Sequence, residues 1–328
     1  MLKYIFKRLI YMVFIFFVMS IVLFSVYNLI PGDPARVEVE GLKATLKPDD
    51  YQRAYEEARQ RLGLDEPKIV RYGKWMGGIL TGDFGQSSVY KKPVTTVIKA
   101  PMGNTIFINI FSIFLALVIT IPLGIICAVK KKSIFDNAVQ VLTIVGYSIP
   151  VFIFSLIFIY IFAVKLRWFP VSGMNTPNFS GTGFAWFLDR MYYLALPLIV
   201  MTVGNLGGLT RYVRAAMIEA LRMDYIRTAR AKGLKEKVVI YSHAWRNALL
   251  PVITLIIGWV MSVFSGSLVI ESIFNLNGMG KFYIAALTNQ DYNVALAVQL
   301  FYMLIALAGN LIIDLSYGLV DPRVRVNN

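Results

Sequence analysis

The chain alternates long apolar runs with shorter polar connections. Six runs are long enough to cross a bilayer, which takes about 20 apolar residues. Because a segment in lipid must satisfy its own backbone hydrogen bonds, we expect each run to be a helix. The six predicted spans are roughly Leu9–Ile30, Thr105–Val129, Ala138–Val164, Tyr192–Val213, Leu249–Ile270 and Ala295–Val320. The pattern therefore predicts an all-α polytopic membrane protein.

The first apolar run has to be distinguished from a secretory signal peptide. The run is too long for the apolar core of a secretory signal peptide, and residues 27–29 make a poor cleavage site. We therefore expect it to remain as a span.

Pro122, Pro150 and Pro197 lie within or beside later runs. They favour kinks or interrupted turns, because proline has no backbone N–H to donate.

Basic residues gather on one side of the predicted spans. The formal net charge is +14, but the charge lies between apolar runs, where it orients spans rather than binds nucleic acid. This side holds Lys3, Lys7, Arg8, Lys130, Lys131, Lys132, Arg211, Arg214, Arg222, Arg227, Arg230, Lys232, Lys235, Lys237, Arg246, Arg323 and Arg325. The opposite short flanks hold Lys165, Arg167, Arg190 and Lys281. The positive-inside rule therefore places both termini in the cytoplasm.

This topology divides the chain into three parts. Residues 1–30 form the cytoplasmic N-terminus and first span, residues 31–100 form an extracytoplasmic subdomain, and residues 101–328 form a five-helix core. The subdomain contains a predicted amphipathic helix from Asp49 to Leu62, with acidic residues leading.

Signals for catalysis are poor. The chain has one histidine, His243, and one cysteine, Cys127, so a multi-histidine metal site and a disulfide framework are excluded. We expect both side chains to be structural. The nearest approach to a phosphate-binding loop is NLNGMGKF, with Asn275 in place of the first glycine and Phe282 in place of serine or threonine. The chain is therefore expected to bind no ATP itself and not to be an enzyme.

A charged, helix-forming segment, residues 222–251, separates the fourth and fifth predicted spans. It predicts a short helix, Tyr225 to Lys232, with Asp224 as N-cap and Gly233 at the C′ position. A helix this short is not stable alone and needs a partner surface.

Tyr225, Ile226 and Ala229 form a small apolar face of this predicted helix. The residues alone leave two interpretations open. The helix docks on a partner protein, or it lies at anionic lipid headgroups.

The sequence DYIRTARAKGL, followed by HAWRNALLPVIT, resembles the cytoplasmic loop of ABC-transporter permeases, and within them the B-type subunit of the peptide/nickel importer family. Further family-like pieces follow in order along nearly the whole chain: LIPGDPA (29–35), LGLDEP (62–67), GDFGQS (82–87), YSIPVF (147–152), RWFPVSG (167–173), ESIFNLNGMG (271–280), DYNV (291–294) and DPRVR (321–325). Of the wider superfamily's E-A-A-x-x-x-G element, the chain keeps Ala229 and Gly233.

The resemblance implies a type I ABC importer permease in a bacterial or archaeal plasma membrane, forming half of a translocation pathway for di- or oligopeptides. It implies a second homologous permease, two cytoplasmic ATPases that bind ATP and Mg, and an extracytoplasmic solute-binding protein. The coupling helix, about 224–233, would seat in a groove of an ATPase. The implied coupling residues are Asp224, Tyr225, Ile226, Arg227, Thr228, Ala229, Arg230, Ala231, Lys232, Gly233 and Leu234.

Polar residues in or near the spans are candidates for the pathway. Asn109, Asn205 and Asn310 are such candidates, and Asp314 lies four residues after Asn310 on the same helical face. Interhelical hydrogen bonding is the alternative for each. Glu271 either holds a peptide amino terminus or braces the adjacent loop.

Other functions remain open at this point. The same family includes permeases for nickel, glutathione and oligosaccharides. From other classes, a stand-alone channel or secondary transporter, or an intramembrane enzyme, would also place a charged loop beside apolar spans. The segment 31–100 either covers the pore mouth or docks the solute-binding protein.

Overall fold

Residues 2–29 and 32–320 are described by the structure, a computed structural model, with side chains at 5–29 and 32–315. These residues form helices and no β-strand, and one isolated bridge pairs Gln86 with Pro93. Contacts divide the chain into two units. The first is Met1–Asn104, Gly266–Leu268 and Asn277–Ala308, and the second is Thr105–Ser265, Val269–Leu276 and Gly309–Asn328.

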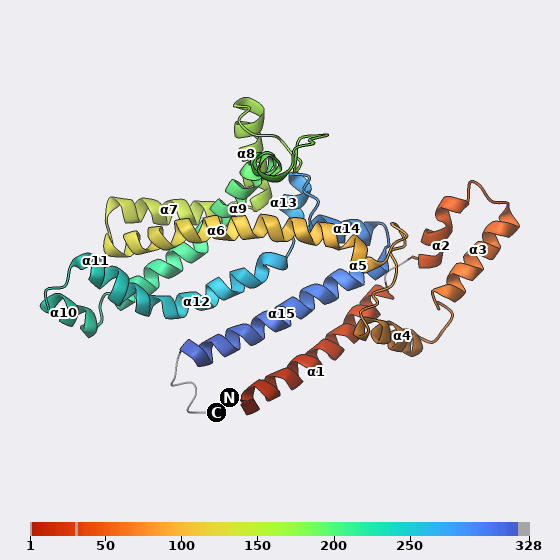
Figure 1. The fold of residues 1–328 in the computed structure, drawn as a ribbon, viewed down its shortest axis with the longest axis horizontal. Helices are drawn as coiled ribbons and strands as arrows, with labels where there is room; N and C mark the ends of the chain where they lie inside the picture. The colour runs from red at the N-terminus through yellow and green to blue at the C-terminus, as the bar shows by residue number, and fades with distance from the viewer. Residues whose placement is uncertain (1, 30–31, 321–328) are drawn as a thin grey trace. The chain divides into compact units, whose positions relative to one another are not determined.

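The first unit contains the N-terminal helices and most of the last helix (Figure 1). Its elements are α1 (Leu2–Tyr27), α2 (Pro34–Val39), η1 (Glu40–Leu42), α3 (Pro48–Arg61), α4 (Lys68–Leu80), α5 (Val94–Val97), α14 (Met279–Thr288) and most of α15 (Tyr292–Val320).

The second unit contains the central helices, together with the end of α15. Its elements are α6 (Lys99–Val129, whose first turns belong to the first unit), α7 (Ile134–Ser148), α8 (Val151–Phe158), η2 (Ile159–Lys165), α9 (Gly183–Ala220), α10 (Asp224–Ala231), α11 (Glu236–Val238), η3 (Val239–Trp245), α12 (Arg246–Met261), η4 (Ser262–Phe264) and α13 (Leu268–Ile273). The segments η2 and η3 are π-helical.

Helices long and apolar enough to cross a membrane occur where five of the six spans are predicted. They are Ile5–Tyr27, Val94–Val129, Gly183–Ala220, Glu236–Phe264 and Tyr292–Leu315. The predicted all-helical membrane class is confirmed. Pro122 and Pro197 lie inside α6 and α9, which continue through them.

The third predicted span, Ala138–Val164, is not one straight helix. Within it α7 ends at Ser148, α8 begins at Val151, and the two directions differ by 103°. Pro150 stands at the break, where its carbonyl accepts hydrogen bonds from the first turn of α8. The bent pair makes a sixth span only if both parts cross together. The predicted interruption at Pro150 is confirmed.

The fifth predicted span, Leu249–Ile270, ends earlier than expected. The helical run stops at Phe264, and Ile270 lies on the separate short helix α13. The cause lies at Gly266, whose added Cβ would be 2.1 Å from the backbone nitrogen of Gly280. Two backbones meet there, which a continuous helix with side chains would prevent.

Close packing in the second unit depends on small residues at helix contacts. A Cβ on Gly124 of α6 would lie 2.7 Å from the Val213 side chain on α9. A Cβ on Gly207 of α9 would lie 2.8 Å from the Thr143 carbonyl oxygen on α7. In lipid no hydrophobic effect drives helices together, so their association depends on close packing, which small residues at the contacts allow.

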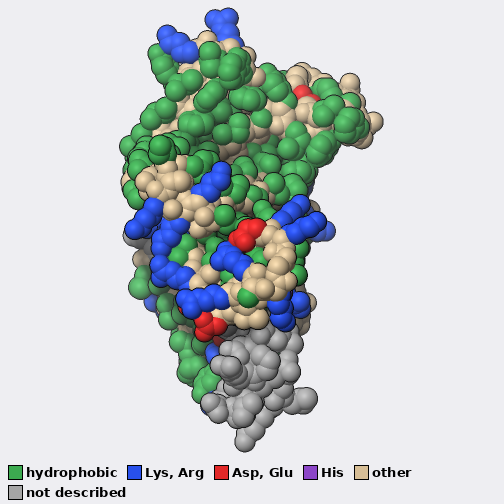
Figure 2. Space-filling view, turned by 90° about the vertical axis from the view of Figure 1, so that its left-hand side faces the viewer, with side chains coloured by type: hydrophobic (Ala, Val, Ile, Leu, Met, Phe, Trp, Pro, Cys, Tyr) green, Lys and Arg blue, Asp and Glu red, His purple; other side chains and the backbone are tan. Residues whose placement is uncertain are grey.

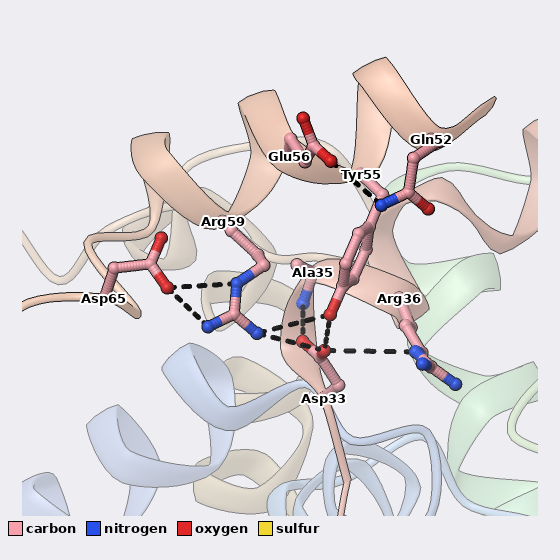
Figure 3. Close-up of polar contacts among 8 residues, drawn as sticks. All are labelled: Asp33, Ala35, Arg36, Gln52, Tyr55, Glu56, Arg59 and Asp65. Atoms are coloured by element: carbon pink, nitrogen blue, oxygen red, sulfur yellow. Dashed lines mark hydrogen bonds and ion pairs between the residues drawn. The ribbon is translucent and has the colours of Figure 1, made fainter. Parts of the chain in front are cut away.

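The predicted helix Asp49–Leu62 is confirmed as α3, with Asp49 and Asp50 in its first turn. It packs against α2 (Figure 1). Figure 3 shows how Asp33 joins the two helices: its carboxylate accepts hydrogen bonds from the Ala35 backbone nitrogen, at 3.0 Å, and from the Tyr55 hydroxyl. The Arg59 guanidinium lies 3.7 Å from the same carboxylate.

Some predicted features lie outside the described residues. They are Ile30, which ends the first predicted span, Pro31, and the DPRVR piece with Arg323 and Arg325.

Candidate functional site

The short helix predicted between the fourth and fifth spans exists as α10. It begins at Asp224 and ends at Ala231. The predicted N-cap is wrong: Met223 is the N-cap, and Asp224 occupies the first turn without a capping hydrogen bond from its side chain. A carboxylate in the first turn still interacts favourably with the helix dipole.

The predicted glycine cap is confirmed. Gly233 has φ +74°, in the left-handed region. Its backbone nitrogen donates to the Arg230 carbonyl at 2.9 Å, and the Leu234 nitrogen donates to the Ala229 carbonyl at 3.4 Å. These two bonds form a Schellman motif, which turns the chain back at the end of the helix.

The apolar face of α10 packs inside the chain itself. Ile226 is 0 % exposed and Ala229 is 4 % exposed, whereas Tyr225 is 39 % exposed. Both buried side chains join a core with residues of α9, η3 and α12, among them Met217 and Val239. The expectation that Tyr225, Ile226 and Ala229 together offer one face to a partner is therefore wrong.

The opposite face of α10 is exposed. Successive helical residues are rotated by about 100°, so Asp224, Arg227, Thr228 and Ala231 point away from the buried pair, and all four are exposed. Figure 1 shows α10 and α11 together beyond the ends of α9 and α12. Figure 2 shows Lys and Arg side chains gathered over this end of the second unit.

Ion pairs cross the surface of this region. The Arg230 guanidinium donates to the Glu236 carboxylate at 2.6 Å and 3.2 Å, joining α10 to α11. This hydrogen bond raises the pKa of Arg230 above its usual value. Arg227 lies 3.4 Å from Asp224. Exposed pairs of this kind contribute only about 0–1 kcal/mol each.

A buried ion pair lies in the first turn of α7, next to the Lys130–Lys132 loop. The Arg214 guanidinium on α9 donates two hydrogen bonds of 2.6 Å to the Asp136 carboxylate, which is fully buried. Asp136 also accepts from the Lys132 backbone nitrogen at 2.9 Å, and its own nitrogen donates to Ser133. The sequence predicted for Arg214 only a place among the basic residues that orient the spans. The Ser-x-x-Asp capping pattern from Ser133 to Asp136 is a local signal that could have drawn attention to Asp136, but nothing in the sequence pairs it with Arg214.

Two pathway candidates, Asn109 and Glu271, are buried and hydrogen-bonded to residues distant in the sequence. Asn109 is 9 % exposed, and its side-chain nitrogen donates to the carbonyls of Val263, at 2.8 Å, and Ser265, at 2.9 Å. It therefore caps the end of the η4 turn. Glu271 is 4 % exposed and accepts a 3.1 Å hydrogen bond from Thr105. Asn109 therefore fits the alternative of interhelical hydrogen bonding, and Glu271 fits the alternative of bracing.

The other candidates lie elsewhere in the second unit. Asn205 is half-buried on α9, and its side chain makes no hydrogen bond with the described residues. Asn310 is exposed on α15, and Asp314 is half-buried there. Cys127 is fully buried, and His243 is half-buried within η3.

Two pieces of the sequence pattern, GDFGQS and DYNV, meet in the first unit. The buried Asp291 carboxylate accepts a hydrogen bond from the Ser87 hydroxyl. The Asn293 side-chain nitrogen donates to the Gln86 carbonyl at 2.8 Å. These bonds hold the 87–93 loop, with Tyr90 exposed on it. Sequence order alone showed no sign of this pairing across some two hundred positions.

The spans, the bent helix pair and the short helix α10 define a multi-pass helical membrane protein. Comparison with known families carries this further. The family described as "Binding-protein-dependent transport system inner membrane component" matches residues 120–326. The description "Binding-prot-dependent transport system membrane comp, N-term" matches residues 1–98. The chain belongs to this family of inner membrane transport components.

Individual relatives and one solved structure agree. The chain is 39 % identical over 325 residues to the "Oligopeptide transport system permease protein AppB" of Bacillus subtilis, covering 99 % of each chain. It is 35 % identical to the "Di/tripeptide transport system permease protein DppB" of Pseudomonas aeruginosa, again covering 99 % of each. A chain of the inward-facing MetNI methionine ABC transporter superposes with TM-score 0.50 at 18 % identity, covering 68 % of this chain and 97 % of that one. The predicted fold and the family resemblance are confirmed.

Proposed function

We propose that this chain is the transmembrane permease subunit of an ATP-driven importer of di- or oligopeptides. Full-length similarity to relatives named for peptide transport carries the proposal. In this assembly a second homologous permease forms the other half of the pathway, and a solute-binding protein delivers the peptide from outside. Two cytoplasmic ATPases bind ATP and Mg²⁺, so hydrolysis takes place outside this chain. Both termini face the cytoplasm in this topology.

The helix α10 is the proposed contact with an ATPase. Its inner residues, Ile226 and Ala229, are anchored in a core shared with α9, η3 and α12. A force on α10 therefore reaches the following span without first unfolding a loop. The contact surface is the outward face, with Asp224, Arg227 and Thr228. The spans then move between inward- and outward-open states by rigid-body rocking.

A substitution on the outward face tests the contact without disturbing the core. Thr228→Arg adds a long charged side chain at an exposed helix position, and arginine is a good helix former. We expect association with the ATPases, measured by co-purification of the assembled complex, to fall at least about tenfold, equivalent to about 1.4 kcal/mol. Peptide uptake in proteoliposomes should fall with it.

Two controls separate docking from folding. Thr45→Arg makes the same change at an exposed position of the 31–100 segment and should leave ATPase association unchanged. Gly233→Ala meets no atom within 4 Å, so it only strains the end of α10, where φ is +74°, by about 1 kcal/mol; ATPase association should therefore fall far less than in Thr228→Arg. Normal ATPase association in the Thr228 variant would refute the proposed contact.

The substrate class has its own test. Proteoliposomes holding the complete transporter should accumulate a labelled tripeptide only when ATP and the binding protein are present. Uptake by the chain alone would instead identify a stand-alone channel or secondary transporter. Uptake of nickel, glutathione or an oligosaccharide, without peptide, would move the chain to another branch of the same family.

A further inference from the structure

A cavity of about 590 Å³ lies within the first unit, where α1 ends and α15 begins. Its apolar wall comes from these two helices, through Phe24, Tyr27 and Leu296. Its polar wall comes from the end of α3 and from α4, which contribute Arg59 and Arg71 among others. The volume is in the range of small-molecule sites.

The polar wall carries more positive than negative charge. Four basic residues line the cavity, against two carboxylates: Arg59, Arg61, Arg71 and Lys74, with Asp33 and Glu66. Three of the cations have acidic partners. Arg59 bonds to Asp65, Arg61 to Glu38, and Lys74 to Glu66.

Arg71 has neither a hydrogen bond nor an ion pair with the described residues. Its guanidinium is half-buried, and burial lowers its pKa, an effect that the more distant Glu66 partly offsets. A half-buried guanidinium without a directly bonded carboxylate is costly, because the distant Glu66 offsets its desolvation only in part.

The cavity holds a second unsatisfied group. The Tyr292 hydroxyl is buried and has no hydrogen-bond partner among the described residues, and the same holds for the Glu66 Oε2 atom of the cavity's polar wall. The neighbouring Tyr27 differs, because its hydroxyl is 2.9 Å from that of Tyr283. Buried hydroxyls are normally paired. Tyr292 and Arg71 both lack an acceptor, and an anionic oxygen in the cavity would supply one.

The place of the cavity along the spans indicates what kind of molecule carries that oxygen. The candidate span of α1 ends at Tyr27, and that of α15 begins at Tyr292. The cavity therefore lies at the border between hydrocarbon and headgroups, where aromatic residues collect. The spans provide its apolar wall, and the polar segment provides its cationic wall. A phospholipid has the matching arrangement, with an apolar acyl chain at one end and a charged headgroup at the other.

We propose that this cavity binds one anionic phospholipid of the leaflet on the side of the 31–100 segment. The phosphate accepts hydrogen bonds from Arg71 and from the Tyr292 hydroxyl, and the start of an acyl chain lies along Phe24 and Leu296. The surplus of cationic residues favours an anionic headgroup over a zwitterionic one. Such a lipid would join α1, α4 and α15 at the membrane border.

Native mass spectrometry of the full-length chain, delipidated in detergent and titrated with phosphatidylglycerol or phosphatidylcholine, tests this proposal. We expect one tightly bound phosphatidylglycerol and weaker phosphatidylcholine. Arg71→Gln should weaken phosphatidylglycerol binding roughly tenfold or more, since a charged hydrogen bond is lost. Tyr292→Phe removes only a hydroxyl and should weaken it about fivefold while leaving the fold intact.

Arg53→Gln is the matched control, because Arg53 is an exposed arginine of α3 that does not line the cavity. It should leave lipid binding unchanged. Equal binding of phosphatidylglycerol by wild type, Arg71→Gln and Tyr292→Phe overturns the proposal. Displacement of the lipid by millimolar trialanine also overturns it, because the cavity would then be a peptide site. If Arg71→Gln does not fold, the Tyr292→Phe result decides.

Discussion

Replacing Arg214 with methionine should lower the free energy of unfolding by about 3–5 kcal/mol. The Asp136 carboxylate is fully buried and receives two 2.6 Å hydrogen bonds from Arg214. Without the guanidinium it keeps only the Lys132 backbone N–H, at 2.9 Å. A buried charge is then left nearly uncompensated, which accounts for the size of the loss.

Replacing the other partner, Asp136, should lower the free energy of unfolding by less. Asp136→Asn keeps the shape of the side chain and still accepts from the Lys132 backbone, so no buried charge is stranded. The Arg214 side chain is 22 % exposed and can partly reach water. We therefore expect a loss of about 1–2 kcal/mol. The double variant should lose less than the sum, with a coupling energy of about 1–3 kcal/mol.

The measurement is reversible unfolding of the full-length protein in mixed micelles, followed by the fluorescence of its five tryptophans. Arg211→Met is the matched control, because Arg211 lies on the same helix and is exposed. It should change the free energy by no more than about 0.5 kcal/mol. The reasoning fails if Arg214→Met costs under about 1 kcal/mol, or if the two single effects simply add.

Two further predictions concern helix contacts in the spans. Gly124→Ala should lower stability by about 1–3 kcal/mol, because the new Cβ meets α9 at 2.7 Å. Gly103→Ala on the same helix meets nothing within 4 Å and should raise stability by about 0.5–1 kcal/mol, so thermal unfolding midpoints of the two variants should move in opposite directions. Asn109→Leu removes the side-chain cap on the η4 carbonyls and should cost about 1–3 kcal/mol. Hydrogen–deuterium exchange should become faster in residues 262–268, and unchanged exchange there would contradict the capping role.

The direction in which the apolar face of α10 points could not be predicted from the sequence. Gly233 predicts the end of the helix correctly, because its cap depends on the local backbone and a left-handed glycine. The direction of the apolar face depends on which core lies behind it. Ile226 and Ala229 suit a partner protein as well as the chain's own α9 and α12, and only the packing distinguishes the two.

The candidate pathway residues show the same limit. Asn109 and Glu271 stand out in the sequence as polar residues in or near the predicted spans. Their partners lie more than 150 positions away in the chain, so no local pattern reveals them. In the structure both bonds brace helix ends, while Asn205 remains without a hydrogen bond among the described residues.

The sequence by itself determined the class of the protein, because lipid requires long apolar helices and their run lengths can be counted directly. It also determined the family, through motifs that keep their order along the chain. The tertiary structure alone decided the 103° bend between α7 and α8, the inward packing of Ile226, and the Arg214–Asp136 pair. Each depends on which distant residues come into contact, and contact over such separations is a property of packing rather than of local pattern.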